Sequence, residues 1–143
     1  VVHALKYHKA MHVLPEIAAV VRANRHFLDF LAGARLVPVP LHARKQRERG
    51  FNQAQLLAEI FAPQARDASV FPLLRRVLDT PTQTRLDREQ RRDNLKNAFA
   101  LLPRAPLEPG FRYVLVDDVF TTGATLNACA SVLRRAANAG MVW

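Results

Sequence analysis

The sequence predicts an α/β fold with a mostly parallel central sheet and helices on both faces. Short β-branched runs alternate with segments of helical periodicity, one apolar run is uninterrupted, and a glycine-containing turn follows that run directly. An uninterrupted apolar run is typical of a parallel strand that is covered on both faces. With 143 residues, half of them hydrophobic, we expect a single domain around one core.

The amino-terminal part is expected to form one long helix that covers the sheet. Pro15 opens it at its first turn, and Gly33 ends it. Its apolar stripe consists of Ile17, Val20, Val21, Phe27, Leu28 and Leu31. Residues 36–40 follow as a short strand, whose two prolines indicate an edge strand or one that ends abruptly.

A basic loop and a second helix are expected next. Asn52 and Gln55 form a capping pair that opens this helix. Its apolar face consists of Leu56, Leu57, Ile60 and Phe61. Residues 71–78 are expected to supply another strand.

The middle of the chain is expected to contain a long mobile loop. Residues 79–96 are polar and carry little apolar periodicity, and loops of this length in compact domains are often functional lids. The sheet resumes in residues 97–102, and a connector with three prolines spans residues 103–110.

The uninterrupted apolar run, residues 113–116, is expected to be a central strand. It precedes a helix over residues 125–139, in which apolar side chains recur at helical spacing as Leu126, Ala130, Leu133 and Ala137. Gly140 ends this helix, and residues 141–143 begin another strand. Because the chain starts at Val1 and stops just inside that strand, we expect a carboxyl-terminal truncation.

Composition limits the class of protein. The formal charge of +9 favours polyanionic partners, the alternative being a solvated basic surface. A single cysteine, Cys129, excludes an internal disulfide and a multi-cysteine zinc site. No run approaches the roughly 20 apolar residues of a membrane span, and no secretory signal pattern is present. We therefore expect a soluble, cytoplasmic protein with no membrane partner.

Residues 117–125 lie where an open parallel sheet binds ligands, beyond the carboxyl end of a strand. Thr121 and Thr122 offer hydroxyls, Gly123 allows close backbone approach, and Thr125 stands where the helix starts with unpaired amides. These features predict an anion-binding turn.

Asp117 and Asp118 would repel each other and would point to opposite faces of a continuing strand, so a structural role explains them poorly. Ionised carboxylates accept hydrogen bonds, which suits a ribose diol and the water of a hydrated Mg²⁺. The alternative is an acidic turn followed by a threonine helix cap.

Residues 114–125, Val-Leu-Val-Asp-Asp-Val-Phe-Thr-Thr-Gly-Ala-Thr, resemble the signature of type I phosphoribosyltransferases, which bind phosphoribosyl pyrophosphate (PRPP). Over nearly the whole chain the resemblance narrows to ComF/GntX-like proteins linked to competence and DNA uptake. The segments that support it are residues 4–7, 37–41, 47–53, 79–83 and 92–99. The resemblance implies a type I phosphoribosyltransferase fold, without the family's N-terminal cysteine-rich zinc segment.

The resemblance also implies a role for each part of the site. Asp117 and Asp118 contact the ribose hydroxyls and hold Mg²⁺ through water. The 5-phosphate is held by Thr121, Thr122, Gly123, Ala124 and Thr125, and pyrophosphate by Leu41, His42, Ala43 and Arg44. A flexible loop, residues 80–95, closes over the reacting centre, with Thr80, Gln83 and Arg92 singled out.

Basic residues cluster after the strand at 36–40. Arg44, Lys45, Arg47 and Arg49 are opposed only by Glu48, and such cations suit a leaving pyrophosphate, the alternative being a solvated turn. We prefer Arg49, with Arg92, as catalytic residues and Gly50 as the point where the backbone bends. Charged residues between 85 and 96 also suit an ordinary exposed helix. Cys129 is interpreted as a core residue rather than a nucleophile.

Two functions remain open from the sequence. The first is transfer of the phosphoribosyl group to an unidentified nitrogen acceptor, whether ammonia, a small amine, a purine or a pyrimidine, with Mg²⁺ as cofactor. The second is a non-catalytic module that senses PRPP or handles single-stranded DNA with other competence proteins. We favour the transferase, and a homodimer fits either function. No basic platform interleaved with aromatic residues is present, because Phe51 and Phe99 are isolated.

Overall fold

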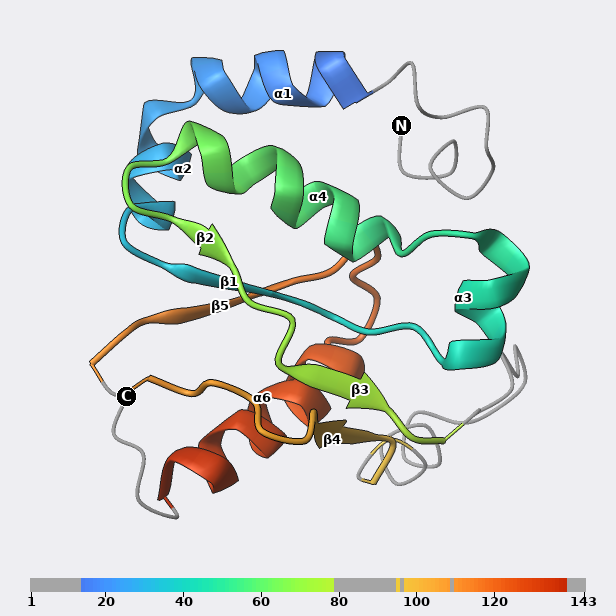
Figure 1. Cartoon of the computed structure of the whole chain (residues 1–143). Helices are drawn as coiled ribbons and strands as arrows, with labels where there is room; N and C mark the ends of the chain where they lie inside the picture. Colours follow the sequence, from blue (N-terminus) through green and yellow to red (C-terminus); the bar gives the residue numbers. More distant parts are fainter. Residues whose placement is uncertain (1–13, 79–94, 96, 109, 139–143) are drawn as a thin grey trace.

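The computed structural model describes residues 14–78, 95, 97–108 and 110–138 (Figure 1). The expectations of a long polar loop over most of residues 79–96, of a helix stop at Gly140 and of a strand at 141–143 lie outside the described residues. The described part confirms an α/β fold with a parallel sheet.

The parallel sheet has three strands in the order β2-β1-β5. They are β1 (Arg35–Pro38), β2 (Ser69–Val70) and β5 (Tyr113–Val116). For residues 36–40, the edge alternative is wrong among the described strands because β1 lies in the middle, whereas the alternative of an abrupt end agrees with the end of β1 at Pro38. The central position predicted for 113–116 is wrong among the same strands, since β5 lies at their edge. β2 pairs with β1 at Arg35 and Leu36 and does not reach Pro38. The missing N–H of Pro38 therefore removes no hydrogen bond between β1 and β2.

Helices cover both faces of this sheet. On one side α4 (Gln53–Phe61) packs against the strands, with α2 (Arg25–Leu31) on the same side and α1 (Leu14–Ala23) farther out against α2 and α4 (Figure 1). On the other side lies α6 (Ala124–Asn138) (Figure 1). Alternate residues of a strand point to opposite faces, and Leu36 and Val37 accordingly enter different cores. The core beneath α4 comprises Leu31, Ala34, Leu36, Ala58, Ala62, Ala65 and Val116.

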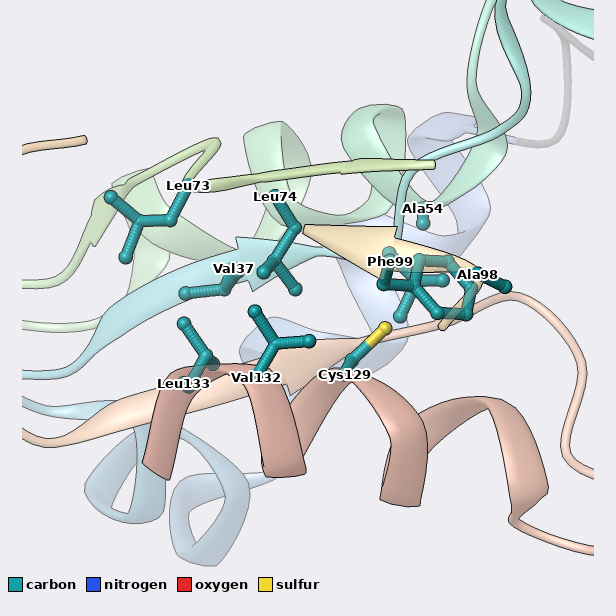
Figure 2. Close-up of a cluster of buried hydrophobic side chains, with 10 residues drawn as sticks. Val37, Ala54, Leu73, Leu74, Ala98, Phe99, Cys129, Val132 and Leu133 are labelled. Atoms are coloured by element: carbon teal, nitrogen blue, oxygen red, sulfur yellow. The ribbon is translucent and has the colours of Figure 1, made fainter. Parts of the chain in front are cut away.

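The second core lies against α6 and is the larger cluster (Figure 2). Cys129, Val132 and Leu133 of α6 point toward Val37 of the sheet. The remaining buried members are Val39, Ala54, Leu73, Leu74, Ala98 and Phe99. Cys129 is fully buried, as the sequence predicted for a core residue.

The predicted amino-terminal helix is two helices. The chain breaks at Asn24, whose side-chain oxygen accepts a hydrogen bond from the N–H of Phe27 at 3.1 Å and so caps α2. Asparagine favours such caps over helix interiors because its side chain competes for backbone groups. The break leaves Val20, expected on the apolar stripe, 70% exposed, whereas Val21 is buried.

The predicted basic loop is a helix, α3 (Ala43–Arg49). Arginine, lysine, glutamine and glutamate are all strong helix formers, and Arg44 and Glu48 form an ion pair at 3.6 Å across one turn. Gly50 ends α3 with a φ of 79°, which confirms the predicted bend there.

Asn52 caps α4 as predicted. Its Oδ1 accepts from the N–H of Ala54 at 3.1 Å, and its Nδ2 donates to the carbonyl of Val39 at 3.0 Å. The reciprocal bond, in which the Gln55 side-chain oxygen would accept from the N–H of Asn52, is absent, and the Gln55 amide donates to Glu59 at 2.8 Å. The predicted apolar face is only half-buried, and the fully buried positions are the smaller Ala54 and Ala58 with Gln53. The short 3-10 helix η3 (Ala62–Gln64) follows α4.

Two predicted strands are confirmed but do not extend the parallel sheet. They are β3 (Leu74–Arg76) and β4 (Phe99–Leu101), which pair with each other antiparallel. β4 lies beside α6 (Figure 1). Within the described part of the chain, no helix has the length and apolar character that crossing a membrane requires.

Arg35 ties the amino ends of the sheet together. Its guanidinium lies 3.9 Å from the ring centre of Phe111 and 4.8 Å from that of Phe71. It also donates to Ser69 Oγ at 2.5 Å and to Glu108 Oε2 at 3.3 Å. This single side chain therefore links β1, the start of β2 and the segment before β5.

Truncation of Leu36 should strongly destabilise the fold. Leu36 is fully buried in the middle strand, so Leu36→Ala should lower the free energy of unfolding by about 2–5 kcal/mol. The exposed Val20 is the control, and Val20→Ala should change it by less than about 0.5 kcal/mol. Urea titration followed by far-UV circular dichroism measures both, and equal losses would contradict the burial of Leu36 and the exposure of Val20.

Candidate functional site

The segments predicted to bind the ligand follow two neighbouring parallel strands. Residues 41–44 follow β1, and Asp117 and Asp118 follow β5 directly. β1 and β5 are parallel, with Pro38 opposite Val116, and the N–H of Val39 donates to the carbonyl of Val116 at 2.8 Å. Both segments therefore lie at the carboxyl edge of the sheet, where open α/β folds bind ligands.

The two carboxyl groups of the acid pair, Asp117 and Asp118, are not equivalent. The N–H of Asp118 donates to Oδ1 of Asp117 at 2.9 Å. Burial and the neighbouring Asp118 raise the pKa of Asp117 from 3.8 to about 6, against backbone hydrogen bonds that lower it. A donor or cation that approached this pair would relieve the repulsion between the two carboxylates.

The turn after the acid pair leads into a long helix. Thr121 and Thr122 are exposed, and Gly123 has a φ of 69°, a conformation that strains other residues. The N–H of Asn127 donates to the carbonyl of Gly123 at 2.9 Å, which fixes Gly123 at the start of α6. The amides of the first turn lack acceptors within the helix, and the helix dipole favours an anion there. The helix starts at Ala124, one residue before the predicted start at Thr125.

A groove of about 310 Å³ lies beside the end of β1. The predicted pyrophosphate residues Leu41 and Ala43 line it, together with Asn52 of α4 and Arg75 and Arg76 of β3. His42 forms an isolated β-bridge with Arg76. Sequence reasoning missed both arginines, although two adjacent cations at the end of a predicted strand were a usable signal. They bring positive charge to the predicted pyrophosphate segment from another strand.

His42 caps the helix that starts this basic region. Its Nδ1 accepts from the N–H of Arg44 at 3.4 Å, so in the neutral ring Nε2 carries the proton and can donate. Arg44 is exposed and pairs with Glu48. Arg49 lies at the opposite end of α3 from His42 and is half-buried. The predicted residues Thr80, Gln83 and Arg92 lie outside the described residues.

Sequence reasoning also passed over the two residues between the acid pair and the threonines. Val119 and Phe120 are both exposed, and Phe120 is 76% exposed. The sequence signal was a large aromatic residue within an otherwise polar turn. Phe120 follows Asp118 by two residues, and its ring lies against Gly123.

The acid pair matches one kind of metal site. Mg²⁺ prefers oxygen ligands, keeps several waters, and is usually held by one or two carboxylates together with ligand phosphates. Among the described residues there is no group of three or more histidine, cysteine, aspartate or glutamate side chains suited to a metal ion. The two adjacent carboxylates of Asp117 and Asp118 are the kind of donor set that a hydrated Mg²⁺ shared with a phosphate ligand would use.

Cys129 lies on the buried side of α6. Burial, with a smaller contribution from Asp117, raises the pKa of its thiol to about 12. Because the thiolate is the nucleophilic form, this cysteine is unsuited to covalent catalysis.

Comparison with known proteins finds relatives along most of the chain. Competence protein F of Haemophilus influenzae is 42% identical over 100 residues, which are 70% of this chain and 44% of that protein. DNA utilization protein YhgH of Salmonella typhimurium is 36% identical over 147 aligned residues, covering 99% of this chain and 63% of the relative. Competence protein ComFC of Bacillus subtilis is 34% identical over 122 residues, 85% of this chain and 44% of that protein.

The chain belongs to the ComF-like, competence-associated family. It spans between 44% and 63% of the length of these three ComF-like relatives. No family model matches the chain, and no solved structure matches it.

The raised pKa of Asp117 predicts a pH-dependent stability. The contribution of this group to folding is fully present below pH 3.8, where it is protonated in both states, and is lost as pH rises through about 6. Asp117→Asn should therefore raise the Tm by a few degrees at pH 8, with the gain vanishing toward pH 4. Scanning calorimetry across this range measures it. Asp29→Asn, at an exposed position of α2, should show no such trend, and a pH-independent gain for Asp117→Asn would contradict the assignment.

Proposed function

We propose that this chain is a PRPP-binding domain that serves as an accessory module in competence and DNA utilisation. The observation that carries the proposal is the direct succession of β5, the acid pair and the amino terminus of α6, beside a basic groove at the same sheet edge. Acceptors for hydroxyls and amides for a phosphate thus lie within nine consecutive residues, 117–125.

Each part of PRPP has a counterpart at this edge. The 5-phosphate suits the first amides of α6 and the hydroxyls of Thr121 and Thr122. The ribose diol suits the acceptor oxygens of Asp117 and Asp118. The diphosphate suits the groove beside residues 41–44, to which Arg75 and Arg76 add positive charge. Mg²⁺ would be held by the acid pair and the diphosphate together, and would neutralise the departing charge.

The accessory role in DNA handling is supported by the relatives. Two of them are named competence proteins and one a DNA utilization protein. The net charge of +9 suits contact with single-stranded DNA or with acidic partner proteins. In this function the domain reports PRPP availability to the uptake process, and no turnover is required.

Phosphoribosyl transfer is the second candidate, and the two arginines beside the predicted pyrophosphate segment favour it. Arg75 and Arg76 line the groove next to residues 41–44, where they would stabilise a departing diphosphate. In this reaction the bond from C1 to the diphosphate oxygen breaks and a bond from an acceptor nitrogen to C1 forms. The nitrogen's proton passes to water, and pyrophosphate leaves. Arg49 and Arg92 are the proposed catalytic cations.

Calorimetric titration with PRPP and Mg²⁺ tests the ligand site. The double variant Asp117→Asn with Asp118→Asn should bind at least about tenfold more weakly, a loss of about 1.4 kcal/mol, because the hydroxyl and Mg²⁺ acceptors are removed. The double variant Asp29→Asn with Asp67→Asn changes net charge equally at exposed positions and should bind like the original chain. If both double variants bound PRPP equally weakly, the loss of affinity would be an effect of net charge, and the assignment of the site would be rejected.

Arg75→Gln tests whether the basic groove takes the diphosphate. Arg75 is exposed and lines the groove, so its loss should weaken PRPP about threefold to tenfold and leave ribose 5-phosphate, which lacks the diphosphate, nearly unaffected. Arg66→Gln, an exposed arginine next to Asp67, is the control. Weakening of both ligands alike by Arg75→Gln would show a general charge effect.

Pyrophosphate release distinguishes the two candidate functions. The chain should be incubated with PRPP, Mg²⁺ and a panel of ammonia, small amines, purines and pyrimidines. Release that depends on an acceptor and on the acid pair would establish transfer. PRPP binding without release across the panel would support the accessory module.

A further inference from the structure

Gln53, the first residue of α4, carries a buried amide. The residue is 1% exposed, and among the described residues neither its Nε2 nor its Oε1 has a hydrogen-bond partner. A buried amide without partners lowers the stability of a fold, and native proteins pair the large majority of such groups. The packing of the ligand-free fold therefore does not account for a glutamine at this position.

This amide lies at the carboxyl edge of the sheet. Leu57 and Phe61 follow Gln53 at intervals of four residues and pack against the cluster that contains Val116. Four helical residues span about 6 Å, and the start of α4 is bonded to the end of β1. α4 and β5 are in contact, and in Figure 1 the chain that leaves β5 passes beneath the start of α4. The same stripe of α4 thus places Gln53 beside the residues that follow Val116.

Alternation along β5 assigns one member of the acid pair to each side of the sheet. Val116 packs in the core beneath α4, and Leu115 packs against the core beneath α6. The same alternation puts Asp117 on the α6 side, where it contributes to the raised pKa of the Cys129 thiol. It puts Asp118 on the α4 side. Asp118 is therefore the carboxylate that faces Gln53.

We propose that Gln53 is a positioning residue for Asp118, to which its amide Nε2 donates when PRPP and Mg²⁺ occupy the site. The inference rests on the proposed function, which assigns the two carboxylates to the ribose diol and Mg²⁺. In the ligand-free chain the backbone N–H of Asp118 donates to Asp117, so the two residues have each other as neighbours. A ligand that binds Asp117 lets the Asp118 carboxylate turn toward the amide. The new bond pairs a buried donor and fixes the orientation of Asp118.

Gln53→Met separates this role from packing, because methionine is also long and unbranched but has no amide. In the ligand-free chain the free energy of unfolding should stay the same or rise, since the unpartnered amide is removed. The affinity for PRPP with Mg²⁺ should fall about fivefold to tenfold. Urea titration measures the stability and calorimetric titration the affinity. Leu57→Met, a replacement by the same residue one turn along α4, is the matched control and should change the affinity by less than about twofold.

A double-mutant cycle tests whether Gln53 acts through Asp118. In an Asp118→Ala background the acceptor is gone, so Gln53→Met should weaken PRPP binding by less than about twofold further. In an Asp117→Ala background the same substitution should still weaken binding about fivefold. A full further loss in the Asp118→Ala background would overturn the link to this carboxylate.

Gln53→Glu identifies which end of the amide faces the acid pair. Glutamate has nearly the same shape as glutamine but offers an oxygen in place of the donating Nε2. PRPP binding should therefore weaken at least as much as in Gln53→Met. Retained affinity would show that the side-chain oxygen of Gln53 faces the site, and the proposed bond would be wrong.

The outcomes separate this inference from the proposed function. PRPP binding that depends on the acid pair but is unchanged in Gln53→Met would overturn the positioning role and leave the ribose site standing. A loss of stability in Gln53→Met with unchanged affinity would assign the amide a purely structural role. No PRPP binding by the original chain would reject both the proposed function and the role of Gln53.

Discussion

The backbone of Val39 is the point to which the candidate site is fixed. Its N–H donates to the carbonyl of Val116 at 2.8 Å, and its carbonyl accepts from the side chain of Asn52 at 3.0 Å. The first bond sets the end of β5 level with the end of β1, so that Asp117 emerges beside the segment that leads to α3. The second fixes the start of α4 at the same place. These two hydrogen bonds thus join the end of β1 to the end of β5 and to the start of α4 at one edge of the sheet.

The two edges of the sheet are built differently. At the amino edge, the Arg35 guanidinium lies against two aromatic rings and donates to a hydroxyl and a carboxylate. At the carboxyl edge, two like charges lie close together in Asp117 and Asp118, and the repulsion contributes to the raised pKa of Asp117. Such a pair costs folding free energy, which the rest of the fold must offset. Local conflict of this kind is typical of sites that await a ligand of complementary charge.

What the sequence could predict was local. The strand, acid pair, glycine turn and helix of residues 113–138 follow one another without interruption, so neighbouring residues suffice to specify them. The order of the strands could not be predicted, because the prolines of residues 36–40 left open an edge strand or one that ends abruptly. The pairing of β1 with both β2 and β5 is decided by residues distant in sequence. The basic segment was predicted to be a loop because the prediction relied on its charge and not on the high helix propensity of its residues. The segment forms α3. The exposure of Phe120 and the position of Arg75 depend on tertiary packing and left only weak sequence signals.

Because Cys129 is buried, the rate at which its thiol is modified reports how often this part of the fold opens. The chain has a single cysteine, fully buried against the sheet on the helix whose first turn forms the proposed phosphate site, with a thiol pKa of about 12. An alkylating reagent can therefore react only while α6 lifts from the sheet, and the rate of modification counts those openings. Any molecule that binds the amino end of α6 in the closed state lowers the rate of Cys129 alkylation, whatever its chemical identity.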